Sequence, residues 1–159
     1  MEVLVNWFTN TLGQHISREM VIFIISMIPI LELRGGLLAA SILNVSIAKA
    51  IPICIIGNII PIPFILLFIK QIFKWLKKTK LFRGLIIKME NRAMGKSDQI
   101  KRYEFLGLLL FVGIPLPGTG AWTGSLIASL LEVDIKKSSI AIFCGLIMAT
   151  VIMSVVSYG

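Results

Sequence analysis

Long apolar runs fill most of this chain and limit what it can fold into. Apolar residues make up 57% of its 159 residues, whereas charged residues make up only 15%. A soluble domain carries about 25% charged residues, so this composition indicates an integral membrane protein. The apolar runs leave no room for a separate soluble domain, and we expect residues 1–159 to form a single membrane domain.

Two apolar segments, Ile47–Ile69 and Ser138–Tyr158, are long enough to cross a bilayer, which takes about 20 helical residues. Two others, Met20–Leu31 and Glu104–Gly113, are too short, and each is followed by a Pro/Gly-rich break and a second apolar run. Two half-length helices around a break predict a re-entrant helical hairpin. A single broken span over Met20–Asn44 is the alternative.

The basic residues gather in one connector, residues 70–102. It holds eleven of the sixteen lysines and arginines and has a net charge of +9, against −1 for the rest of the chain. Lysine and arginine are enriched in cytoplasmic loops, so we expect a multi-pass protein of the cell membrane with this connector in the cytoplasm. Apolar residues recur between the charges at helical spacing, which predicts a surface helix that contacts anionic lipids rather than nucleic acid. Residues Asn91–Gln99 are expected to be a turn or a flexible stretch.

The N-terminal residues 1–14 have the pattern of a short amphipathic helix, with Val3 and Trp7 on one side. Such a helix either lies at the membrane interface or packs on the domain. Ser17 is expected to cap the helix that follows, because its hydroxyl can accept a hydrogen bond from a free N–H group of the first turn.

A shift of 88 residues aligns the two halves of the chain without a gap. It pairs Pro29 with Pro117 and Gly36 with Gly124, matches that apolar composition alone does not explain. If each unit is a hairpin, a short turn and a full span, it crosses the membrane once, and the second unit is inverted. The predicted fold is therefore an all-α integral membrane protein of two inverted repeats with amphipathic interfacial helices. Its parts are an interfacial helix (1–16), repeat 1 (17–69), the connector (70–102) and repeat 2 (103–159).

The first break, between Pro29 and Gly36, places two charged side chains inside an apolar segment. Ionisable residues at membrane depth are costly and are candidates for function. Arg34 suits a phosphate or carboxylate, because its planar fork donates two parallel hydrogen bonds. Glu32, partly removed from water, can carry a proton. The structural alternative is that Glu32 and Arg34 only neutralise each other.

The second break, Pro115 to Gly124, has no charge but is dense in proline and glycine. Its glycines let backbone N–H groups approach an anion at a helix N-terminus, and its threonines add hydroxyl donors. Trp122 is expected to pack on a lipid tail or to anchor the chain at the interface. A tight turn that needs these residues only for its shape is the alternative. The predicted substrate-binding residues are Glu32, Arg34, Gly35, Gly36, Pro117, Gly118, Thr119, Gly120, Trp122 and Thr123; Pro29, Asn58 and Pro115 are expected to line the cavity.

No pattern in the chain indicates hydrolytic, redox or ATP-dependent chemistry. There is no Walker loop and no Ser/His/Asp grouping, and His15 is the only histidine. Cys54 and Cys144 lie in apolar runs and are expected to be buried thiols without a disulfide or a metal. We therefore expect neither an enzyme nor a cofactor-binding or metal-binding protein.

The motifs Pro29-x-x-Glu32-Leu-Arg34-Gly35-Gly36 and Pro115-Leu-Pro117-Gly118-Thr119-Gly120-Ala121-Trp122-Thr123-Gly124 resemble the two signatures of the small multidrug export proteins. The resemblance covers nearly the whole chain, and the family is distantly similar to the DedA/VTT superfamily. That relation implies opposed re-entrant hairpins and the transport or scrambling of lipids, including the carrier undecaprenyl phosphate. Glu32 and Arg34 match the acidic and basic positions of the first tip, whereas the second tip has no arginine.

The predicted function is proton- or ion-coupled transport of an amphiphilic anion such as a lipid-linked phosphate. Arg34 would bind the anion, and Glu32 would be its protonatable partner. One alternative is an exporter of lipophilic cations in which Glu32 is the essential charge, and another is a lipid-binding membrane scaffold without transport. A chain this short is expected to form a homodimer in order to enclose a pathway.

Overall fold

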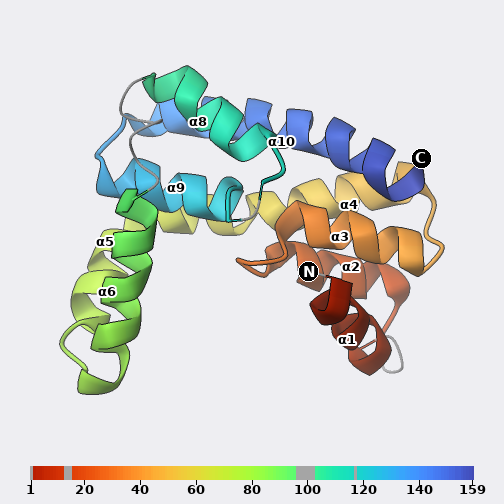
Figure 1. The fold of residues 1–159 in the computed structure, drawn as a ribbon, viewed down its shortest axis with the longest axis horizontal. Coiled ribbons are helices and arrows are strands. Elements are labelled where there is room, and N and C mark those ends of the chain that lie inside the picture. The colour runs from red at the N-terminus through yellow and green to blue at the C-terminus, as the bar shows by residue number, and fades with distance from the viewer. Residues whose placement is uncertain (1, 13–15, 96–102, 117) are drawn as a thin grey trace.

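The computed structural model describes residues 2–12, 16–95, 103–116 and 118–159, and every regular element in these ranges is an α-helix (Figure 1). The prediction of an all-helical chain is thus confirmed. The helices are α1 (Glu2–Leu12), α2 (Arg18–Met27), α3 (Glu32–Ile42), α4 (Ile47–Ile59), α5 (Pro61–Leu76), α6 (Lys80–Gly95), α8 (Glu104–Gly113), α9 (Ala121–Leu130) and α10 (Ile135–Tyr158).

Two helical stretches are long and apolar enough to cross a membrane, as expected. One is α10, with 24 residues, and the other is the 30-residue stretch Ile47–Leu76 made of α4 and α5. This second stretch does not end at Ile69 but continues into the basic connector, where Lys70 and Lys74 lie on α5. A bend separates α4 from α5 because Pro61, which starts α5, has no N–H group to donate (Figure 1).

The described part of the connector consists of the last turns of α5 and all of α6, and these two helices lie side by side and project from the body of the molecule (Figure 1). An ion pair between Lys77 and Glu90 joins the two helices. Residues Asn91–Gly95 are helical and not the expected turn, because α6 continues to Gly95; residues 96–102 lie outside the described ranges. Contact of this pair with anionic lipids stays a prediction.

The helix α1 is confirmed, and one of its faces packs on α2 and α3. Val5 and Thr9 are buried on that face, whereas Val3 and Trp7 are exposed. The helix therefore packs on the domain and also offers an apolar face to its surroundings.

The segment Met20–Asn44 is not one continuous rod, because α2 and α3 are separate helices that lie beside each other. The side chain of Ser17 accepts a hydrogen bond from the Met20 N–H group at 3.3 Å, so the predicted N-cap is confirmed. At Gly36 of α3 an added Cβ would lie 2.0 Å from the Ser26 hydroxyl oxygen of α2. The absence of a side chain thus lets the two helices approach closely.

Matching local geometry accompanies the sequence repeat. Each unit consists of a short helix, a break, a second short helix and a long apolar stretch. The second short helices, α3 and α9, are each followed, two residues after their last residue, by a residue with positive φ: Asn44 (54°) and Glu132 (58°), which are 88 positions apart. The next residue in each unit, Val45 or Val133, donates its N–H group five residues back, as in a Schellman cap.

The two units differ in the length of their breaks, which corrects the gapless alignment. The first short helices, α2 and α8, begin 86 residues apart, whereas α4 and α10 begin 88 apart. Gly57 of α4 packs so closely on Phe23 that an added Cβ would lie 2.8 Å from the Phe23 carbonyl oxygen. Gly145 of α10 packs in the same way on Leu109, where the distance would be 2.6 Å. Phe23 and Leu109 are also 86 apart. The offset between the units thus grows from 86 to 88 residues across the break, and Pro29 corresponds to Pro115 rather than to Pro117.

The units also pack on each other. In the first unit, Ser41 of α3 donates a hydrogen bond to the Ser157 carbonyl of α10 at 2.6 Å. Its counterpart Ser129 of α9 donates to the Leu66 carbonyl of α5 at 3.4 Å. The second short helix of each unit is thus bonded to the long apolar stretch of the other.

The two cysteines differ in their surroundings. Both are free, but Cys54 is buried beside Gly36, whereas Cys144 is exposed on α10. The expectation of a buried thiol is therefore right for Cys54 and wrong for Cys144, whose side of α10 faces outward.

Candidate functional site where the two breaks meet

Glu32 is the first residue of α3 and reaches from the first break to the second. Its side chain is buried, and its φ of 51° is positive, which is uncommon for a residue with a Cβ. One carboxylate oxygen, Oε2, accepts a hydrogen bond from the Ala121 N–H group at 3.1 Å, and Oε1 accepts one from Trp122 at 3.0 Å. These N–H groups belong to the first turn of α9 and have no acceptor within the helix. Glu32 therefore caps α9 across 90 residues of sequence.

Gly120 makes room for this carboxylate. An added Cβ at this position would lie 2.0 Å from Oε2 of Glu32. The φ of Gly120 is 135°, a conformation that residues with a side chain rarely adopt. Both the space and the backbone angle at the start of α9 therefore require glycine.

Arg34 is also on α3, two residues after Glu32, and its side chain is buried. It donates hydrogen bonds to carbonyl groups at the end of α8, the first short helix of the second unit. Its Nη1 atom donates a hydrogen bond to the Leu116 carbonyl at 2.7 Å. Its Nη2 atom is 3.2 Å from the Ile114 carbonyl and 3.5 Å from that of Val112. These oxygens lie at the C-terminal end of α8 and just beyond it, where carbonyl groups lack helical donors and a cation is favoured.

Glu32 and Arg34 thus bind opposite kinds of helix end in the second unit. The carboxylate sits at the positive end of α9 and the guanidinium at the negative end of α8, which is the favourable arrangement for both helix dipoles. We call this set of hydrogen bonds, which Glu32 accepts from the second break and Arg34 donates to it, the crossed cap. Glu32 and Arg34 have these partners in the second break, so they do more than neutralise each other.

Thr119 and Trp122 complete the contact between the breaks. The Thr119 hydroxyl accepts a hydrogen bond from Nη2 of Arg34 at 3.0 Å and lies 2.8 Å from the Leu116 carbonyl oxygen. The Trp122 indole N–H group donates to the Met27 carbonyl at the end of α2, at 3.2 Å. The indole thus joins α9 to the first unit, and its packing on a lipid tail or its place at the interface stays a prediction.

The other predicted residues lie around the crossed cap in different surroundings. Gly35 and Gly36 are buried inside α3, where they allow close packing, and Gly118 forms part of the exposed turn with a φ of 75°. Thr123 is half-buried on α9, Pro115 is half-buried, and Pro29 is exposed. Pro117 lies outside the described residues. Asn58 is buried on α4, as expected, and its Oδ1 atom has no hydrogen-bond partner. Their roles in substrate binding stay predictions.

Sequence reasoning missed the backbone groups that hold the charges. The Ala121 N–H group and the Leu116 and Met27 carbonyls carry no signal in their residue types. The one signal for them was indirect. Glu32 and Arg34 are charges in an apolar chain and need partners, and the second break was the place where partners could lie. Among the described residues, no cluster of three or more metal-ligating side chains accompanies this site.

The fold and the site together define a class. A helical chain with two stretches long enough to span a bilayer, and with buried charges satisfied by helix ends, is a helical membrane protein. The chain belongs to the family described as "Putative small multi-drug export protein", whose model matches residues 32–152. The resemblance seen in the two motifs is thus confirmed. No curated protein and no solved structure matches the chain.

Proposed function

We propose that this protein is a transporter of the cell membrane that carries an amphiphilic anion, such as a lipid-linked phosphate, coupled to a proton or another ion. The family description supports transport. The crossed cap supports the anion, because it brings two backbone N–H groups and a guanidinium together in one buried region. This convergence of hydrogen-bond donors is the observation that carries the proposal.

In this proposal Glu32 occupies the place that the substrate takes. Free N–H groups at a helix N-terminus form an anion site, and here a carboxylate fills it at about 3 Å. An arriving phosphate displaces Glu32 from Ala121 and Trp122, and the displaced carboxylate takes up a proton in its apolar surroundings. Arg34 turns from the carbonyls of the second break to the phosphate, for which its planar fork is suited. Anion binding is then linked to proton uptake.

The proposed membrane arrangement follows from the contact between the breaks. Each pair of short helices, α2–α3 and α8–α9, is a re-entrant hairpin, and the two enter from opposite faces. Their breaks then meet at depth, which accords with the hydrogen bonds from Glu32 and Arg34 to the second break. The basic connector lies in the cytoplasm. A homodimer encloses the pathway.

The family description names multi-drug export, and we propose export of lipophilic cations as a second candidate. In that case the buried Glu32 carboxylate is the counter-charge for the substrate, and the donors of the crossed cap only hold it in place. Arg34 then has a structural role and does not touch the substrate.

Binding of a short-chain polyprenyl phosphate to the purified protein separates these candidates. The variants are Arg34→Lys, which keeps the charge but loses the fork, and Glu32→Gln, with Glu104→Gln at the exposed start of α8 as the matched control. The anion proposal expects Arg34→Lys to weaken binding at least about tenfold, a change of about 1.4 kcal/mol. Unchanged binding in Arg34→Lys, together with loss of lipophilic-cation efflux in Glu32→Gln, would overturn it in favour of the second candidate.

A further inference from the structure

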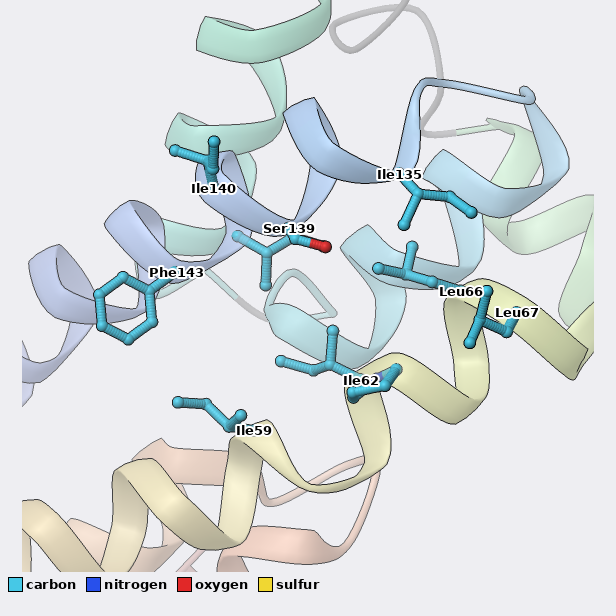
Figure 2. A pocket seen from close by; sticks show the side chains of 10 residues that line it. Ile59, Ile62, Leu66, Leu67, Ile135, Ser139, Ile140 and Phe143 are labelled. Carbon is cyan, nitrogen blue, oxygen red and sulfur yellow. The ribbon is translucent and has the colours of Figure 1, made fainter.

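A groove runs between the α4–α5 stretch and α10, away from the crossed cap. Figure 2 shows Ile59 and Ile62 on one side of it and Ser139 and Phe143 of α10 on the other. The cavity measures about 400 Å³, and Ser139 is the one polar residue among those that line it. Its size is within the range of about 300–1,000 Å³ that is typical of small-molecule sites.

A second cavity of about 440 Å³ continues this groove. The two share Leu66, Leu67 and Ile135, but the second is also lined by Lys70 and Glu132. Gln71, Ser129 and Asp134 add further polar groups. The cleft is therefore apolar at one end and charged at the other, which is the pattern of an amphiphilic molecule. We call it the α5–α10 cleft.

The charged end carries one cation and two anions. Nζ of Lys70 lies 2.7 Å from Oε1 of Glu132, and the two side chains are 42% and 79% exposed. The Asp134 carboxylate accepts a hydrogen bond from the Lys137 N–H group at 3.0 Å and keeps further acceptor capacity. An exposed ion pair of this kind contributes about 1 kcal/mol or less, so a ligand can open it at little cost. A phosphate would then meet Lys70, and an amine would meet the two carboxylates.

In the other unit, the two residues at the corresponding positions are uncharged, and the nearby Arg18 side chain donates a hydrogen bond to the Leu43 carbonyl at 3.1 Å. Lys70 and Glu132 correspond, over 88 residues, to Tyr158 and Asn44. There the Tyr158 hydroxyl donates a hydrogen bond to the Val45 carbonyl at 2.8 Å. The fold thus does not require charged residues at this position, and the α5–α10 cleft has a chemical character that its counterpart lacks.

We infer that the α5–α10 cleft binds one membrane lipid whose head carries both a phosphate and an amine. Its acyl chain lies in the groove between Ile62 and Phe143. Its phosphate pairs with Lys70 and its amine with Glu132 and Asp134. This site is separate from the crossed cap, and the inference stands whether or not the proposed transport is correct.

Native mass spectrometry of the purified protein tests this inference with two probes of identical acyl chains, phosphatidylethanolamine and phosphatidylglycerol. The unmodified protein is expected to retain the first over the second by at least about threefold, as fits weak exposed ion pairs. Leu67→Trp fills the cleft from a half-exposed position and should abolish that preference. Val155→Trp, the corresponding position on α10 in the second unit, is the matched control and should leave it unchanged.

The double variant Glu132→Asn, Asp134→Asn removes both carboxylates. Asparagine preserves the cap of α10 and suits the positive φ at position 132, so this variant should fold even if Leu67→Trp does not. With Lys70 left alone, the preference should reverse towards phosphatidylglycerol. Equal retention of the two lipids by the unmodified protein, or an unchanged preference in the double variant, would overturn the inference.

Discussion

The two breaks occupy the same place in the repeat but contribute opposite kinds of groups. The first supplies charged side chains, Glu32 and Arg34, whereas the second supplies backbone N–H and carbonyl groups together with uncharged side chains. Glu32 and Gly120 are 88 positions apart, and both have a positive φ, 51° and 135°. One carries a carboxylate, and the other leaves the space that this carboxylate fills.

The difference between Glu32 and Gly120 shows why the two units have to differ at this position. Glutamate at both positions would bring two carboxylates together in a buried place, where only one could stay charged. Glycine at both would leave the N–H groups at the start of α9 without an acceptor, at a cost of about 1–3 kcal/mol for each buried group. The pair is stable only because the two breaks differ.

The strongest test of this comparison is Gly120→Ala. The added Cβ overlaps Oε2 of Glu32, and alanine is strained at a φ of 135°, so we expect a loss of at least about 3 kcal/mol in stability. Thermal unfolding of the purified protein measures this loss. With Glu32→Gly added, the total loss should be smaller than the sum of the two single losses, because the overlap then disappears. Strictly additive losses in the double variant would show that Gly120 and Glu32 are not coupled.

Arg34→Lys tests the other charge of the first break. An ammonium group cannot serve the Leu116 and Ile114 carbonyls with the geometry of the guanidinium fork, so we expect a loss of about 2 kcal/mol. Chemical denaturation in detergent, with the change read by circular dichroism, measures it. A variant as stable as the unmodified protein would show that the carbonyls of the second break do not depend on Arg34.

A paired substitution in the long helices asks how similar the two units are. Gly57→Ala and Gly145→Ala each place a Cβ within 3 Å of a backbone carbonyl of the first short helix in the same unit, α2 or α8. We expect each to cost about 1–3 kcal/mol, and the two losses to be similar. The midpoints of thermal unfolding compare them directly. A large loss at one position and none at the other would limit the resemblance of the units to their sequences.

The smallest effect is expected at the ends of α3 and α9. Asn44→Glu places at the first end the residue found at the second, and it should cost a few tenths of a kcal/mol, roughly, because asparagine tolerates a positive φ better than glutamate. Glu132→Asn should shift stability in the opposite direction. Melting temperatures of the two variants give the signs, and equal signs would contradict this account.

The sequence predicted the elements well where apolar length and helix breakers decide them. It predicted both long stretches, the two breaks and the cap at Ser17. It missed the continuation of α5 through Lys70 and Lys74, because a helix that leaves an apolar region loses hydropathy without losing its backbone hydrogen bonds. It misplaced the alignment of Pro29, because prolines at 115 and 117 both fit the pattern and only the packing of Phe23 and Leu109 separates them.

The site was predictable only in part. Buried charges in an apolar chain identified Glu32 and Arg34, and the repeat placed the two breaks together as a prediction. The partners of these charges are backbone atoms of Leu116, Ala121 and Trp122, whose chemistry is the same in every residue type. Their roles follow from where helices begin and end in space, which no single-sequence pattern encodes.

The crossed cap also sets an order for biosynthesis. Glu32 and Arg34 leave the ribosome 78 to 90 residues before the groups that satisfy them, and Ser41 precedes its acceptor by 116. During that interval Glu32 and Arg34 lack the backbone groups of the second unit that bind them in the folded protein. These contacts of the first half therefore form only after the second half has been translated.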